Sequence, residues 1–284
     1  MTFNLKEEIK IKLEDIDWNQ MWKEIQDHET NHSPDESAIE ARWDRTAAQF
    51  RQWMEVDDYP LKLMQRVKLN PEWSLLDIGC GAGAVSIPAA KKAGRVTALD
   101  ISGEMLKILK EDAQKEHLSN ITCMHRSWTD IAVGEDIEPH DVVVASRSVG
   151  REPDIQSALE KIDRAASRYV YITVWGGGEH GHCKGVPAAL GRPYRNTQDH
   201  VYFYNILSQM GIHANVEHLE CHSRLIYNDL DEAMESCKIS IGPLNKKEEK
   251  IARDYLDKTL IRIENGMLEV PDNRPVWSLI WWKK

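Results

Sequence analysis

The sequence predicts an α/β fold built on a doubly wound, mostly parallel sheet, and three observations support this prediction. Apolar, strand-like runs alternate with helical stretches between residues 73 and 175, which is typical of a parallel sheet covered by helices on both faces. The run 75–78 leads directly into glycines at alternate positions. A second run, 95–99, ends in an acid, Asp100. Both runs therefore stop at residue types that suit ligand binding at the ends of parallel strands.

The same patterns place seven strands along the chain. The first five cover residues 73–78, 95–100, 121–125, 140–146 and 168–175. Their spacing fits strand–helix–strand units. A helix over 199–210, closed by Gly211, precedes a sixth strand at 212–219, and the apolar run 276–282 is the seventh strand.

Helical segments flank this sheet in the sequence. Residues 1–60 are predicted to form an N-terminal helical lid on the main domain, residues 61–284, because apolar residues recur at helical spacing on both sides of a break at 31–35. A helical insertion at 225–270 separates the sixth and seventh strands and holds two predicted helices, 230–239 and 246–263. The insertion either caps a substrate pocket or packs on the sheet edge or on another subunit, which leaves a homodimer open.

Composition bounds the class of protein. The chain has 284 residues, 42% of them hydrophobic, and is long enough to bury a sizeable core. No apolar run reaches the roughly 18 residues of a membrane helix, and the N-terminus lacks the order of a signal peptide. Five cysteines without a Cys-x-x-Cys pair predict free thiols, and a net charge of −10 disfavours nucleic acid as a partner. We expect a soluble, cytoplasmic protein without a membrane partner.

The turn after the first strand has the features of a cofactor site. Glycines at 79, 81 and 83 remove side chains where the backbone approaches a ligand and where φ is positive. Asp100 stands 17 residues after Gly83, where doubly wound folds place an acid that accepts hydrogen bonds from ribose hydroxyls. A dinucleotide site reads G-x-G-x-x-G, whereas here the glycines alternate behind Asp77. That acid would repel a pyrophosphate and suits the ammonium group of S-adenosylmethionine.

The run Asp-x-Gly-x-Gly-x-Gly, followed by Leu-Asp-Ile-Ser-x-x-Met-Leu at 99–106, resembles the cofactor motifs of the class I S-adenosylmethionine-dependent methyltransferases. The resemblance covers roughly residues 40–222 and the last strand, which it implies to be antiparallel and to lie between the fifth and sixth strands. After the third strand the family often presents an acid to adenine, and this chain has Ser127 and Trp128 instead. The implied cofactor-binding residues are Asp77, Gly79, Cys80, Gly81, Gly83, Asp100, Ile101, Met105, Ser127, Trp128 and Ser146.

Candidate residues for the methyl acceptor follow the fourth and fifth strands. Arg147 either binds an anionic substrate or pairs with a carboxylate on the surface, and the second interpretation is favoured. Trp43 belongs to a helix that either covers the cofactor or only packs on the core. The predicted substrate-binding residues are Trp43, Arg147, Trp175, Cys183 and Tyr202.

Residues 176–187 are predicted to form a loop because they are rich in glycine and polar. This loop holds His180 and His182, the candidate catalytic residues, beside Cys183. These side chains either contact substrate, move protons or bind a metal, or they belong to a plain loop. Ligands at recognised zinc spacing are absent from the sequence, so no metal site is predicted.

The sequence therefore predicts a methyltransferase that uses S-adenosylmethionine and releases S-adenosylhomocysteine. We expect the acceptor to be an N, O or S atom of a small molecule, methylated by in-line displacement. The alternatives are a protein or RNA methyltransferase, an NAD-dependent oxidoreductase and a non-catalytic S-adenosylmethionine-binding regulator.

Overall fold

The computed structural model describes residues 12, 15–29, 36–179, 185–192, 198–264 and 266–284. Seven strands form the central sheet in the order β3-β2-β1-β4-β5-β10-β6. They are β1 (Ser74–Ile78), β2 (Arg95–Asp100), β3 (Ile121–His125), β4 (His140–Ser146), β5 (Ala166–Glu179), β6 (Asn215–Glu220) and β10 (Arg274–Lys283). The first five pair in parallel, and β10 runs antiparallel between β5 and β6. The predicted fold class and the position of the last strand are confirmed.

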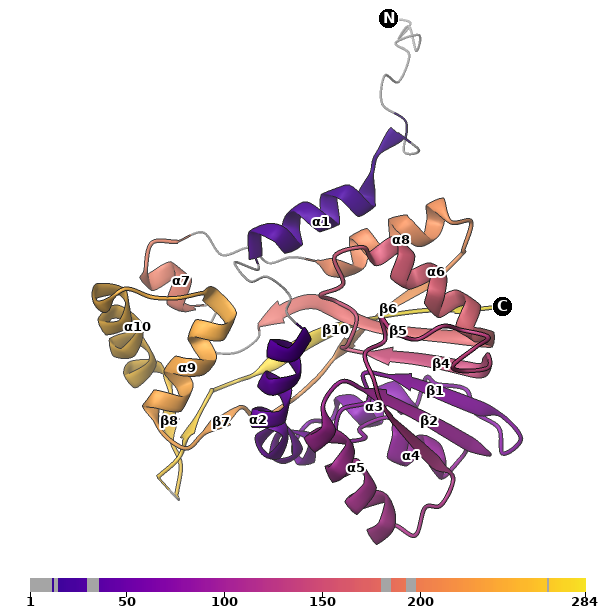
Figure 1. Ribbon diagram of the computed structural model, residues 1–284. Coiled ribbons are helices and arrows are strands. Elements are labelled where there is room, and N and C mark those ends of the chain that lie inside the picture. Colours follow the sequence, from indigo (N-terminus) through magenta and orange to yellow (C-terminus); the bar gives the residue numbers. More distant parts are fainter. Residues whose placement is uncertain (1–11, 13–14, 30–35, 180–184, 193–197, 265) are drawn as a thin grey trace, which may run out of the picture.

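Helices cover both faces of the sheet (Figure 1). One face carries α1 (Trp18–Glu29), α6 (Ile155–Ala165) and α8 (Asp199–Gln209), and the other carries α3 (Tyr59–Met64), α4 (Ser86–Ala90) and α5 (Gly103–Lys115). Along β4, Val143 and Ala145 join the core on the first face, while Val142 and Val144 join the core on the second. Because both faces are buried, these strands are continuous apolar runs in the sequence.

The insertion forms a small unit with its own core. It consists of β7 (Ile226–Tyr227), α9 (Leu230–Ile241), α10 (Lys246–Thr259), β8 (Ile261–Arg262) and β9 (Leu268–Glu269), and α7 (Gly185–Ala189) packs against it. The two predicted helices are present, although α10 ends four residues early. The three-stranded sheet β7-β9-β8 was not predicted, because two-residue strands carry no periodicity. Figure 1 shows this unit on the side of the sheet where β5 ends.

The prediction of a loop from residue 176 is wrong for its first part, because β5 continues to Glu179. There it pairs with the start of β10, Gly178 opposite Pro275 and Glu179 opposite Arg274. A Cβ atom on Gly176 would lie 2.5 Å from the Ser278 hydroxyl, so this glycine permits the close strand pairing. The last residues of the predicted loop are helical, because α7 begins at Gly185. His180, His182 and Cys183 lie outside the described residues.

Smaller differences concern the ends of the chain's elements. The sixth strand begins at Asn215 and not at 212. The predicted break at 31–35 lies outside the described residues, between α1 and α2 (Glu36–Glu55).

Among the residues that the structure covers, no helix is both long and apolar enough to cross a membrane. The four cysteines described, Cys80, Cys123, Cys221 and Cys237, are all free thiols, as predicted for them.

Candidate cofactor and acceptor site

The glycine turn after β1 packs too tightly for side chains. Gly79, Gly81 and Gly83 all have positive φ, at 66°, 52° and 96°. A Cβ atom on Gly79 would lie 2.4 Å from the Cβ of Ser148, and one on Gly83 would lie 2.4 Å from Leu109 Cδ1 of α5. A Cβ on Gly81 would meet only the Phe50 ring, at 3.4 Å. The absence of side chains at Gly79 and Gly83 therefore lets the turn pack closely on Ser148 and on α5. Gly81 lies next to the Phe50 ring of α2.

Asp77 is fully buried at the end of β1. Its Oδ2 accepts a hydrogen bond of 2.6 Å from the Ser86 hydroxyl, and its Oδ1 has no partner among the described residues. Burial and, after it, the negative charge of the nearby Asp100 raise the pKa of this carboxyl to about 7, although hydrogen bonds from Ser86 oppose the rise. A buried carboxylate oxygen without a donor fits a cationic donor group such as the ammonium of S-adenosylmethionine.

The raised pKa predicts how stability depends on pH. The folded pKa exceeds the ordinary Asp value, so the ligand-free protein loses stability as pH rises from about 4 to 7, and the whole penalty is present above pH 7. We expect Asp77→Asn to unfold at a higher temperature than the parent at pH 8, with an advantage on the order of 4 kcal/mol that shrinks toward pH 5. Thermal unfolding of both proteins across this range tests the prediction. An advantage that does not change with pH would contradict it.

Asp100 ends β2 beside the glycine turn and is 9% exposed. Its Oδ2 accepts a hydrogen bond from the Gly81 amide at 2.7 Å, and its Oδ1 accepts one from the Ser102 amide at 2.8 Å. Burial raises the pKa of this carboxyl, and the two amide hydrogen bonds oppose the rise. Each carboxylate oxygen can accept a second hydrogen bond. Asp100 therefore fixes the turn and keeps acceptor capacity for ribose hydroxyls.

The other predicted cofactor residues lie around this turn. Cys80 and Met105 are buried, and Met105 packs with Ala47 of α2. The Ile101 carbonyl accepts a hydrogen bond from His125. Ser127 bonds to the Thr129 hydroxyl. Trp128 is 7% exposed, its ring lies 4.5 Å from the Lys161 ammonium, and its Nε1 has no partner among the described residues. Contact of Ser127 and Trp128 with adenine stays a prediction.

Helix α2 lies across the ends of β2 and β3. Three acids spaced four residues apart bond to the last residue of β3 and to the segments after β2 and β3: Glu36 to the Thr129 hydroxyl, Glu40 to His125 and Asp44 to the Ser102 hydroxyl. Sequence reasoning missed these acids, although their i, i+4 spacing on one helical face was a readable signal. Trp43 is 38% exposed on this helix, with its ring packed edge-on against Phe50.

Arg147 lies at the end of β4 in a left-handed conformation, with φ at 57°. Its Nη1 pairs with Asp57 Oδ2 at 3.1 Å, and its guanidinium lies 4.1 Å from the Tyr59 ring and 5.2 Å from the Trp277 ring. The predicted pairing with a carboxylate is confirmed, but not its place on the surface. The side chains of Arg147 and Asp57 are only 19% and 9% exposed, because α3 and β10 cover them.

The Tyr59 ring beside Arg147 is fixed to strands β4 and β5 by hydrogen bonds between hydroxyl groups. The Tyr59 hydroxyl lies 2.6 Å from Ser146 Oγ and 2.5 Å from Thr173 Oγ1. Trp175 packs edge-on, at 5.4 Å, against Trp277, the ring that also contacts Arg147. The structure thus joins Ser146, Arg147 and Trp175 with Asp57, Tyr59 and Trp277, three residues that sequence reasoning missed because they come from distant segments.

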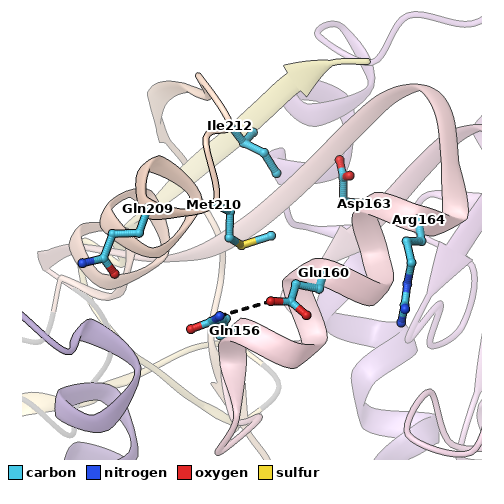
Figure 2. A pocket seen from close by; sticks show the side chains of 7 residues that line it. All are labelled: Gln156, Glu160, Asp163, Arg164, Gln209, Met210 and Ile212. Carbon is cyan, nitrogen blue, oxygen red and sulfur yellow. Dashed lines mark hydrogen bonds between the residues drawn. The ribbon is translucent and has the colours of Figure 1, made fainter. Parts of the chain in front are cut away.

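Tyr202 lies elsewhere. It is on α8, and its ring packs against Trp18 and Trp22 of α1 at 6.2 and 5.8 Å. Near it, a groove of about 450 Å³ runs between α6 and α8 (Figure 2). Asp163 in this groove accepts a hydrogen bond from Trp282 near the end of β10. Because β10 is antiparallel, its end lies beside the start of β5, at the opposite end of the parallel strands from the glycine turn. The groove is therefore separate from the site. No group of three metal-ligating side chains occurs among the described residues.

Comparison with known proteins agrees with this geometry. Residues 75–168 match a family described as a methyltransferase domain. An uncharacterized protein of Haemophilus influenzae is 30% identical over 244 residues, which cover 85% of this chain and 88% of that protein. A nocamycin O-methyltransferase of Saccharothrix syringae is 30% identical, but the match covers only 36% of this chain and 37% of that enzyme.

A solved structure shares the fold. It is a candidate methyltransferase of Bacillus halodurans with a TM-score of 0.51 and 13% identity, and the match covers 79% of this chain and 98% of that one. Other relatives are named for methylation of ribosomal RNA and ribosomal protein, so their names do not decide the acceptor. The glycine turn, the acids that end β1 and β2, and the matched domain together show that this chain belongs to the class I S-adenosylmethionine-dependent methyltransferases.

Proposed function

We propose that this methyltransferase acts on an N, O or S atom of a small molecule. The observation that carries the proposal is the position of α2, which is bonded at three successive turns to the end of β3 and to the segments after β2 and β3. A helix held across the ends of the strands narrows the approach to the cofactor, whereas a macromolecular acceptor needs an open cleft. The net charge of −10 also disfavours RNA.

The described residues support a division of roles. We assign the ammonium of S-adenosylmethionine to Asp77, the ribose hydroxyls to Asp100 and the adenine to the segment at Ser127 and Trp128. When bound, the cofactor supplies a methyl group on a sulfonium, which an acceptor lone pair attacks while the S–CH₃ bond breaks. The leaving thioether is neutral and needs no proton, so the protein contributes chiefly alignment and exclusion of water, and Phe50 and Trp43 of α2 serve the second task.

Two measurements test the proposed function. S-adenosylmethionine and S-adenosylhomocysteine are expected to raise the melting temperature, and NAD is not. Labelled methyl from the cofactor is then offered to a cell extract split by ultrafiltration into small molecules and macromolecules. We expect label in the small-molecule fraction. Label that enters only protein or RNA would refute the small-molecule proposal, and binding of cofactor without any transfer would support a regulator.

Asp100→Ala tests the assigned cofactor contact. The variant removes the charged acceptor of the ribose hydroxyls, so we expect affinity for S-adenosylhomocysteine to fall by roughly tenfold to a hundredfold. Titration calorimetry measures this loss. The control is Asp112→Ala on α5, which removes an acid that pairs with Arg51 and Lys115, away from the turn. Parent affinity in the Asp100 variant would remove Asp100 from the site.

A further inference from the structure

Asp44 of α2 accepts two hydrogen bonds from the segment that follows β2. Its Oδ1 lies 2.6 Å from the Ser102 hydroxyl and 3.2 Å from the Glu104 amide, and both groups donate to it. The hydrogen bond from Ser102 is the largest cause that lowers the pKa of the Asp44 carboxyl, and the one from the Glu104 amide is the next. Asp44 is therefore an ionised acceptor at neutral pH, placed at the N-terminus of α5.

Ser102 connects Asp44 to the carboxyl group that we assign to the ribose. Ser102 is fully buried. Its backbone amide donates to Asp100 Oδ1 at 2.8 Å, and its hydroxyl accepts a hydrogen bond from the Met105 amide at 3.1 Å. A serine hydroxyl has one proton and a carboxylate only accepts, so this proton lies between Ser102 and Asp44. One buried residue thus bonds to two acids, to Asp100 through its amide and to Asp44 through its hydroxyl.

Asp44 determines how the Ser102 hydroxyl is oriented. With its proton directed to Asp44, the hydroxyl oxygen presents its lone pairs to the Met105 amide and caps the first turn of α5. Without Asp44 the buried proton loses its acceptor, and an unsatisfied buried hydroxyl is unfavourable. The segment relieves this loss by moving, and the peptide unit that moves carries the amide bonded to Asp100.

Helix α2 lies along α5 (Figure 1), but its other side-chain bonds do not pass through Ser102. Glu40 bonds to His125, and both side chains are exposed, at 40% and 52%. Arg51 pairs with Asp112 in the second half of α5. The helix is therefore held at several places, and one of them acts on the ribose-binding acid.

We propose that Asp44 is a positioning residue of the cofactor site, which fixes Asp100 through Ser102 in the orientation that accepts the ribose hydroxyls. This inference rests on the proposed function, because it takes the ribose contact of Asp100 from it. Asp44 itself does not touch the cofactor. Cofactor binding and the docking of α2 are then linked, since both favour the same arrangement of residues 100–105.

Two ligands separate this role from general support of the fold. S-adenosylhomocysteine and its 2′,3′-dideoxy analogue, which lacks both ribose hydroxyls, are titrated by calorimetry into the parent and into Asp44→Ala. We expect affinity for S-adenosylhomocysteine to fall roughly fivefold to twentyfold in the variant, and affinity for the analogue to change by less than about twofold. An equal fall for both ligands, or no fall for either, overturns the proposal.

Two further variants carry the test if Asp44→Ala does not fold. Asp44→Asn retains an oxygen that accepts from Ser102 and Glu104, so its affinity for S-adenosylhomocysteine should stay within about threefold of the parent value. Ser102→Ala removes the connection and should lower this affinity as much as Asp44→Ala does, with no further loss in the double variant. A loss in Asp44→Asn as large as in Ser102→Ala, or additive losses in the double variant, overturn the proposal.

Glu104→Gln is the matched control. It removes an acid from the same helix end, where the Glu104 side chain pairs with the exposed Lys107, and it keeps the backbone amide that bonds to Asp44. We expect parent affinity for both ligands. A fall equal to that of Asp44→Ala would show that negative charge at this helix end, and not the Ser102 hydrogen bond, is what matters, and would overturn the proposal.

Asp100→Ala distinguishes failure of the inference from failure of the function on which it rests. Lost affinity in Asp100→Ala together with parent affinity in Asp44→Ala overturns only the positioning role. Parent affinity in Asp100→Ala, with equal binding of the two ligands by the parent, shows that the ribose contact is wrong, and the inference fails with it. In the Asp100→Ala background, Asp44→Ala should change affinity by less than about twofold, because the acid that it positions is gone.

Discussion

Gly79→Val is expected to abolish binding of S-adenosylmethionine and to destabilise the protein by more than about 3 kcal/mol. The glycine has a φ of 66°, which a β-branched residue resists. The added Cβ would also lie 2.4 Å from the Ser148 Cβ, whose hydroxyl bonds to the Ile78 carbonyl at 2.6 Å. The turn must then move away from the loop after β4. Calorimetry with S-adenosylhomocysteine and thermal unfolding measure the two effects.

Gly211→Val is the matched control for this prediction. Gly211 has a φ of 78°, but a Cβ there would meet no atom within 4 Å. It therefore carries the backbone strain without the clash, and we expect a loss of about 1–2 kcal/mol with unchanged cofactor affinity. The double variant Gly79→Ala/Ser148→Gly removes the Ser148 Cβ that the added Cβ at position 79 would meet, so it should recover some of the loss of Gly79→Ala. Parent affinity in Gly79→Val would contradict the assignment of the turn.

Arg147→Met should cost about 3–5 kcal/mol of stability, because it leaves the largely buried Asp57 carboxylate without its cation. Among the described residues, the Tyr59 amide, at 3.0 Å, is the one other donor to the Asp57 side chain. The methionine retains much of the apolar stem that packs on the Tyr59 and Trp277 rings. The effect therefore reports mainly the lost charge. Chemical denaturation of parent and variant measures it.

A second substitution distinguishes the lost charge from lost packing. Arg147→Met/Asp57→Asn removes both charges and keeps an acceptor for the Tyr59 amide, so we expect it to recover more than half of the loss. Arg168→Met breaks a more exposed pair with Asp141, whose side chains are 53% and 24% exposed, and should cost about 1 kcal/mol or less. Equal losses in Arg147→Met and in the double variant would show that the ion pair does not matter.

Local sequence patterns determined the sheet and the glycine turn. The central strands β1 and β4 are buried on both faces and are therefore largely apolar runs, and the glycines and Asp100 stand at strand ends within a short stretch of chain. These features depend on neighbours in sequence, and the resemblance to the family rested on the same residues. The antiparallel position of β10 came from that resemblance, since β10 is as apolar as a parallel strand and its pattern does not show its direction.

Only the tertiary structure decided what surrounds the predicted acceptor site. Asp57 is 90 residues from Arg147 in the sequence, and Trp277 comes from the last strand. The extension of β5 to Glu179 depends likewise on its pairing with β10. Such contacts are set by the packing of distant elements, which overrides the polar and glycine-rich character of the local sequence.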